Sequence, residues 1–117
     1  MDRKILLNKI FIVTGVSSGI GKEIAKILIN EYNAKVYGIA RNEEKILNLK
    51  KQLNKPENLI GYSLFDVSNE DNWINFSEIC KQINPNGLIN CAGILPKFSS
   101  FNKSVTLILH VENPPSW

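Results

Sequence analysis

The sequence predicts an α/β fold in which a parallel sheet carries helices on both of its faces. Short apolar runs alternate with amphipathic segments along the chain, and clusters of turn-forming residues separate them. A glycine-rich turn joins the first apolar run to the first amphipathic segment. Strands and helices that alternate at this spacing imply right-handed crossovers and hence a parallel sheet.

Length and composition exclude several classes of protein. The chain has 117 residues, about one domain, and 44% of them are hydrophobic, which is enough for a core. The net charge of +3 is scattered and forms no basic tract, which argues against nucleic-acid binding. Cys80 and Cys91 lack zinc or thioredoxin spacing, so we expect free thiols and no metal site. No apolar stretch has the length of a membrane span or of a signal peptide, so we expect a cytoplasmic protein.

The first strand and helix have clear signals. Residues 10–13 are a continuous apolar run, typical of a strand buried on both faces. Gly15, Gly19 and Gly21 then form a turn into a helix, which a left-handed Asn33 is expected to end. Four apolar residues of this helix recur at helical spacing, namely Ile20, Ile24, Ile27 and Leu28.

Residues 35–40 predict a second strand, followed by a helix with Asn42 as its N-cap. Glu43 and Glu44 fall in the first turn of this helix and Lys50-Lys51 in the last, which suits the helix dipole. Its buried stripe should comprise Ile46, Leu49 and Leu53.

Residues 59–67 predict a third strand, and Ser68 opens a segment close to a capping box, where a third helix should begin. The apolar face of that helix comprises Trp73, Phe76, Cys80 and Ile83. A turn at residues 85–87 leads into a fourth strand from Leu88.

The segment from Thr14 to Gly21 carries the strongest functional signal. Glycine lets a phosphate approach the backbone, and the helix that follows directs N–H groups and a positive dipole end to the same place. Ser17 and Ser18 add hydroxyl donors. A tight turn without a ligand is the alternative, but the turn follows a buried strand and opens an amphipathic helix, as dinucleotide-binding loops do. We therefore predict a pyrophosphate cradle.

Three segments in register resemble motifs of the short-chain dehydrogenase/reductase (SDR) family. Residues 14–21 resemble Thr-Gly-x-x-x-Gly-Ile-Gly, Asp66-Val67 resembles the Asp-Val pair after the third strand, and residues 90–93 resemble Asn-Asn-Ala-Gly with cysteine second. The resemblance covers residues 5 to 96. It implies a Rossmann-like fold with a dinucleotide-binding half-domain at residues 1–95, followed by an irregular or degraded tail at 96–117.

The resemblance also implies cofactor contacts. Four residues of the loop would line the pyrophosphate, namely Gly15, Gly19, Ile20 and Gly21. Asp66 would accept a hydrogen bond from the adenine amino group, and Val67 would pack on the ring. Asn90, Ala92 and Gly93 would lie near the riboses. A turn role for Asp66 and a strand-tying role for Asn90 stay open as alternatives.

The end of the second strand bears on the choice between NAD and NADP. NAD binders carry a carboxylate there for the ribose 2′-hydroxyl. Here the sequence is Ala40-Arg41-Asn42, and no carboxylate precedes Glu43. Because an arginine can pair with a 2′-phosphate through two parallel bonds, we predict NADP rather than NAD. The alternative is that Arg41 is a solvated charge that stacks on the adenine.

The resemblance implies hydride transfer between cofactor and a carbonyl or alcohol, with a catalytic serine and Tyr-x-x-x-Lys. The three tyrosines, Tyr32, Tyr37 and Tyr62, all precede Gly93, so no catalytic residue is assigned. We expect a truncated, inactive reductase, with a non-catalytic nucleotide-binding or regulatory module as the alternative. Truncation after about the fourth strand would remove the family's oligomerisation helices. It would also expose that strand as an edge through which copies could associate.

Overall fold

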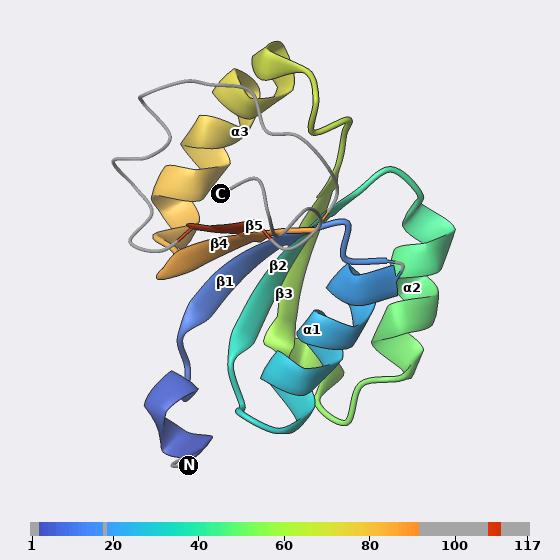
Figure 1. The fold of residues 1–117 in the computed structure, drawn as a ribbon, viewed down its shortest axis with the longest axis vertical. Coiled ribbons are helices and arrows are strands. Elements are labelled where there is room, and N and C mark those ends of the chain that lie inside the picture. Colours follow the sequence, from blue (N-terminus) through green and yellow to red (C-terminus); the bar gives the residue numbers. More distant parts are fainter. Residues whose placement is uncertain (1–2, 18, 92–107, 111–117) are drawn as a thin grey trace.

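The structure is a computed structural model that describes residues 3–17, 19–91 and 108–110 (Figure 1). It contains a parallel sheet in the order β3-β2-β1-β4-β5. The strands are β1 (Ile10–Thr14), β2 (Lys35–Ala40), β3 (Leu59–Leu64), β4 (Gly87–Asn90) and β5 (Ile108–His110). The helices are α1 (Gly19–Asn30), α2 (Glu43–Lys51) and α3 (Glu70–Ile83), with short 3-10 helices at Arg3–Leu6 and Pro56–Asn58. The predicted α/β class is confirmed.

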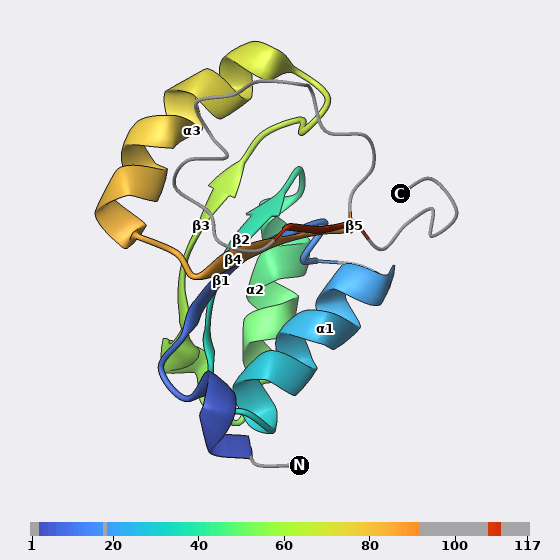
Figure 2. The same cartoon turned by 60° about the vertical axis from the view of Figure 1, so that its left-hand side comes forward.

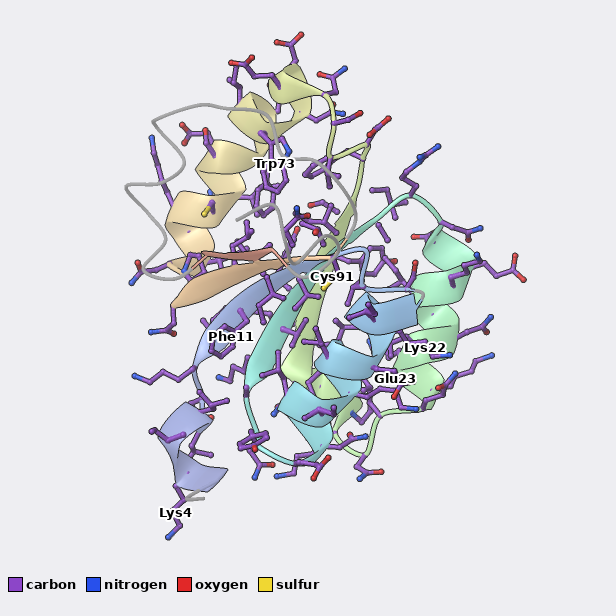
Figure 3. The ribbon with its side chains drawn as sticks, viewed as in Figure 1. Lys4, Phe11, Lys22, Glu23, Trp73 and Cys91 are labelled. Carbon is purple, nitrogen blue, oxygen red and sulfur yellow. The ribbon has the colours of Figure 1, made fainter. Side chains whose placement is uncertain are left out.

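The sheet separates two apolar cores. α1 and α2 lie together on one face, and α3 covers the other (Figures 1 and 2). Successive residues of β1 point to opposite cores, because Val13 packs with α1 and α2 whereas Ile12 packs with α3. Trp73 lies fully buried between α3 and the sheet (Figure 3), and burial of so large a side chain stabilises the fold by on the order of 3 kcal/mol. β1 is thus buried on both faces, as its continuous apolar run predicts.

The buried face of α1 differs from the one that the spacing predicts. Ile20 and Ile27 are 54% and 44% exposed. The residues that α1 buries are Gly21, Ala25, Leu28 and Ile29. The small Gly21 and Ala25 let the helix approach the sheet closely, which turns part of the isoleucine stripe outward. The predicted left-handed backbone at Asn33 is confirmed by its φ of 55°.

The caps of the other two helices follow local sequence signals. Asn42 is the N-cap of α2, where its side-chain oxygen accepts a hydrogen bond from the Lys45 N–H over 3.2 Å. The N-cap of α3 is Asn69, one residue later than predicted, and its side chain accepts from the Asp71 N–H over 2.9 Å. The expected cap, Ser68, instead donates to Asp66 through its hydroxyl.

The sheet extends beyond the four strands that the sequence predicts. β5 pairs in parallel with β4, with Leu88 opposite Ile108 and Asn90 opposite His110. The prediction that the fourth strand forms an exposed edge was therefore wrong, and so was the expectation that residues 108–110 are irregular. The rest of the expected tail lies outside the described residues, and the division at residue 95 stays a prediction.

Candidate functional site

The glycine loop joins β1 to α1 and folds over the end of β2. Gly15 and Gly19 have φ values of 65° and 56°, in the left-handed region that favours glycine. The Gly15 N–H donates to the Ile39 carbonyl over 2.8 Å, and the Val16 N–H donates to the same oxygen over 3.3 Å. Val16 is fully buried. The loop is therefore fixed to the sheet at its first two residues.

The absence of a side chain has different consequences at Gly19 and at Gly21. A Cβ atom at Gly21 would lie 2.1 Å from the Gly15 carbonyl oxygen, so only glycine fits against the loop backbone. A Cβ atom at Gly19 would meet nothing within 4 Å. Gly21 thus packs the helix onto the loop, whereas Gly19 leaves open space at the N-terminus of α1, where backbone N–H groups favour a phosphate.

A buried polar contact ties β1 to β4 at the same edge of the sheet. The Thr14 hydroxyl donates to the Asn90 side-chain oxygen over 2.6 Å, and the Cys91 N–H donates to the Thr14 hydroxyl oxygen over 2.9 Å. Thr14 and Asn90 are fully buried. This geometry agrees with the strand-tying role, the alternative that the sequence leaves open for Asn90.

A pocket of about 290 Å³ opens at the carboxyl ends of the strands, and we call it the strand-end pocket. Five predicted site residues line it, namely Gly15, Ser17, Arg41, Asp66 and Val67. Six further residues complete the lining, namely Ile39, Ala40, Asn42, Lys45, Phe65 and Cys91. Figure 3 shows Cys91 near the centre of the molecule, where the strands end. The pocket therefore joins the glycine loop to the ends of β2, β3 and β4.

Asp66 is held in place by the turn that precedes α3. One of its carboxylate oxygens accepts from the Ser68 hydroxyl over 2.7 Å and from the Ser68 N–H over 2.9 Å. These two bonds hold the pKa of the Asp66 carboxyl below its ordinary value, and the charge of Arg41 acts in the same direction. The turn role is thus present, while the carboxylate still lines the pocket. Next to it, the Val67 carbonyl accepts from the Trp73 indole over 2.7 Å.

The remaining predicted site residues lie elsewhere. Ile20 is 54% exposed and does not line the strand-end pocket. Gly21 is buried in α1, and Asn90 is buried in β4 against Thr14. Ser18, Ala92 and Gly93 lie outside the described residues, so their predicted contacts are untested.

A second pocket of about 320 Å³, which we call the interhelix pocket, lies between α1 and α2. Its lining comprises Ser17, Gly19, Lys22, Lys45, Asn48, Leu49 and Gln52. Because Ser17 and Lys45 line both pockets, the two hollows adjoin. The described residues that line the interhelix pocket include no carboxylate.

Lys45 and Cys91 line the strand-end pocket although no motif in the sequence predicts that they do. Lys45 belongs to the first turn of a helix that starts at a strand end, which is a usable signal because such turns face the sheet edge. Over residues 3–17, 19–91 and 108–110, no three metal-ligating side chains gather into a metal site. The helices described are too short or too polar to cross a bilayer.

The comparisons with known proteins agree with this geometry. A model of the short chain dehydrogenase family matches residues 9–108. The chain belongs to this family. A short-chain dehydrogenase/reductase of Phomopsis amygdali is 58% identical over 40 residues, which cover 34% of this chain and 12% of the relative. An uncharacterized oxidoreductase of Staphylococcus epidermidis is 36% identical over 66 residues, which cover 56% of this chain and 28% of the relative.

Solved structures of the family superpose on the same part of the fold. The oxidoreductase yciK of Escherichia coli is 26% identical with a TM-score of 0.61, over 80% of this chain and 40% of that one. A protein of Escherichia coli CFT073 described as a short chain dehydrogenase, complexed with NADPH, is 27% identical with a TM-score of 0.58, over 80% and 41% of the two chains. This SDR chain spans less than half the length of these relatives.

Proposed function

We propose that this SDR chain binds NADP(H) along the carboxyl ends of its strands. The observation that carries the proposal is the strand-end pocket, which joins the glycine loop to Arg41 and Asp66. The pyrophosphate would lie on the N-terminus of α1, in the space that Gly19 leaves open. The NADPH bound to the Escherichia coli CFT073 relative supports the class of ligand.

The adenosine half would occupy the strand-end pocket. The Asp66 carboxylate, which Ser68 orients, accepts a hydrogen bond from the adenine amino group, and Val67 packs on the adenine ring. Ser17 adds a hydroxyl donor toward the phosphates. Asn90 acts indirectly, because it fixes Thr14 and hence the ends of β1 and β4. By the family resemblance, Ser18, Ala92 and Gly93 complete the cofactor site.

The charge at the end of β2 favours NADP over NAD. Arg41 lines the pocket, and the first carboxylate after it, Glu43, does not. The Glu43 carboxylate instead accepts a hydrogen bond from the Tyr62 hydroxyl over 2.7 Å. A 2′-phosphate therefore meets a guanidinium there, whereas the carboxylate that would repel it is engaged elsewhere.

The family chemistry is hydride transfer between the cofactor and a carbonyl or alcohol, which needs a proton donor within reach of the substrate oxygen. We assign no such donor to this chain. Two of its tyrosine hydroxyls are engaged in contacts to side chains, Tyr37 with Ser63 and Tyr62 with Glu43. We therefore propose nucleotide binding without turnover by this chain alone.

Calorimetric titration of the 117-residue chain with NADPH, NADH and ATP tests the proposal. We expect saturable heat with NADPH, weaker binding of NADH, and no oxidation of NADPH with a panel of carbonyl compounds. The absence of saturable heat from either dinucleotide would overturn the binding proposal. Turnover that follows the purified chain through chromatography would overturn the proposed lack of catalysis.

A further inference from the structure

The first turn of α2 lies where the strand-end and interhelix pockets adjoin. Lys45 lines both pockets, and so does Ser17 of the glycine loop. The side chain of Lys45 is exposed and forms no hydrogen bond or ion pair with another described residue. Its ammonium group is therefore available to a ligand that enters from either side.

The neighbouring carboxylates do not neutralise Lys45. Glu43, two residues earlier in the same turn, lines neither pocket and is hydrogen-bonded to Tyr62 of β3. Among the residues that the structure describes, Asp66 is the one carboxylate that lines the strand-end pocket, and one of its oxygens accepts hydrogen bonds from Ser68. The place where the pockets meet is thus positively charged, with Arg41 on one side and Lys22 on the other.

We propose that Lys45 is a second specificity residue for the 2′-phosphate, which it binds together with Arg41. This inference rests on the proposed binding of NADP(H). A phosphate monoester carries about −1.5 to −2 charges at pH 7, so one guanidinium leaves part of its charge unmatched. Lys45, in the first turn of α2, supplies the second positive charge in the lining of the same pocket. NADH lacks this phosphate and so should not depend on Lys45.

Lys22 would bind the 2′-phosphate if that phosphate occupied the interhelix pocket rather than the strand-end pocket. It lines the interhelix pocket but not the strand-end pocket, and Figure 3 shows it on α1. In that case Lys22 would contribute more than Lys45 to the preference for NADPH over NADH. The two lysines therefore distinguish the proposed position of the phosphate from its alternative.

The test compares Lys45→Gln with Lys45→Arg, Lys22→Gln and the matched control Lys51→Gln in the last turn of the same helix. Each variant is titrated with NADPH and NADH at low and high salt, after circular dichroism has confirmed its fold. Lys45→Gln should raise the Kd for NADPH about tenfold, the loss expected for one charge-assisted hydrogen bond, and change that for NADH less than about twofold. Its salt dependence for NADPH should also become shallower. Lys45→Arg should keep the preference, and Lys51→Gln should leave both constants unchanged.

Two outcomes would overturn the inference while the proposed function stands. In one, the wild type prefers NADPH but Lys45→Gln leaves the ratio of the two constants unchanged. In the other, Lys22→Gln removes the preference and Lys45→Gln does not. A wild-type chain that binds neither dinucleotide would overturn the proposed function and the role of Lys45 with it.

Discussion

Replacement of Gly21 by alanine tests how tightly the glycine loop is packed onto α1. The added Cβ atom would lie 2.1 Å from the Gly15 carbonyl oxygen and 2.7 Å from its carbonyl carbon. Cβ atoms in proteins essentially never approach a neighbouring heavy atom closer than 3.0 Å. The obstacle is backbone, and that backbone is hydrogen-bonded to Ile39. Relief of the clash therefore requires the loop and the helix to separate by roughly 1 Å, a backbone shift of the kind that overpacking causes.

The expected magnitude is the difference of two terms. Alanine in a helix is more stable than glycine by about 1 kcal/mol, whereas overpacking costs about 1–3 kcal/mol. We expect Gly21→Ala to lower the free energy of unfolding by up to about 2 kcal/mol. It should also weaken NADPH binding by roughly tenfold, because the N–H groups at the N-terminus of α1 would move relative to the loop with which they form the phosphate site.

Gly19→Ala is the matched control. Its methyl group meets nothing within 4 Å, but the left-handed φ of 56° costs about 1 kcal/mol for a residue with a side chain. Gly19→Ala should therefore lower the free energy of unfolding by about 1 kcal/mol through backbone strain alone, and weaken NADPH binding because the added methyl group enters the phosphate space. Urea denaturation followed by circular dichroism gives the stability, and calorimetry gives the Kd. A Gly21→Ala chain as stable as the wild type, with unchanged NADPH binding, would refute the packing argument.

Three further predictions concern the polar contacts around the site. Asn90→Leu should lower the free energy of unfolding by about 1–3 kcal/mol, because it deprives the buried Thr14 hydroxyl of its acceptor, and an unchanged urea midpoint would contradict this. The pKa of Asp66 lies below its ordinary value in the folded chain, so its stabilising contribution is present above that value and is lost as the pH falls through the lowered pKa. The stability advantage of the wild type over Asp66→Asn should accordingly be constant above about pH 5 and shrink as the pH falls below about 4, the ordinary pKa of an aspartate, and a constant difference in urea unfolding across that range would count against it. Tyr62→Phe should release the Glu43 carboxylate and reduce the preference for NADPH over NADH, and Tyr62→Phe with Glu43→Gln should restore it, whereas an unaltered ratio of Kd values in the single variant would show that the contact does not act on the cofactor site.

Local signals account for the parts of the fold that the sequence predicts well. The span of β2 and the cap of α2 at Asn42 match the prediction, because an apolar run and a short polar side chain determine them within a few residues. The glycine loop is also predictable from local sequence, because the left-handed φ at Gly15 and the close packing at Gly21 leave few alternatives to glycine. Family membership follows from three such local motifs.

The features that the sequence does not predict depend on packing between distant segments. The buried face of α1 is decided by the fit of Gly21 against Gly15, so helical spacing alone misassigned Ile20 and Ile27. β5 pairs with β4 without a helical pattern before it that would mark a crossover. Lys45 becomes a lining residue only when α2 lies beside the glycine loop, across more than twenty residues of chain.

Thiol labelling at Cys91 tests most directly whether the nucleotide occupies the strand-end pocket. Cys91 lines that pocket, whereas Cys80 is 1% exposed and burial raises the pKa of its thiol, so Cys80 serves as an internal control in the folded chain. Mass spectrometry after brief alkylation should find Cys91 modified in the free chain and protected by NADPH at lower concentrations than by NADH. Modification of Cys91 at the same rate with and without saturating NADPH would contradict the account.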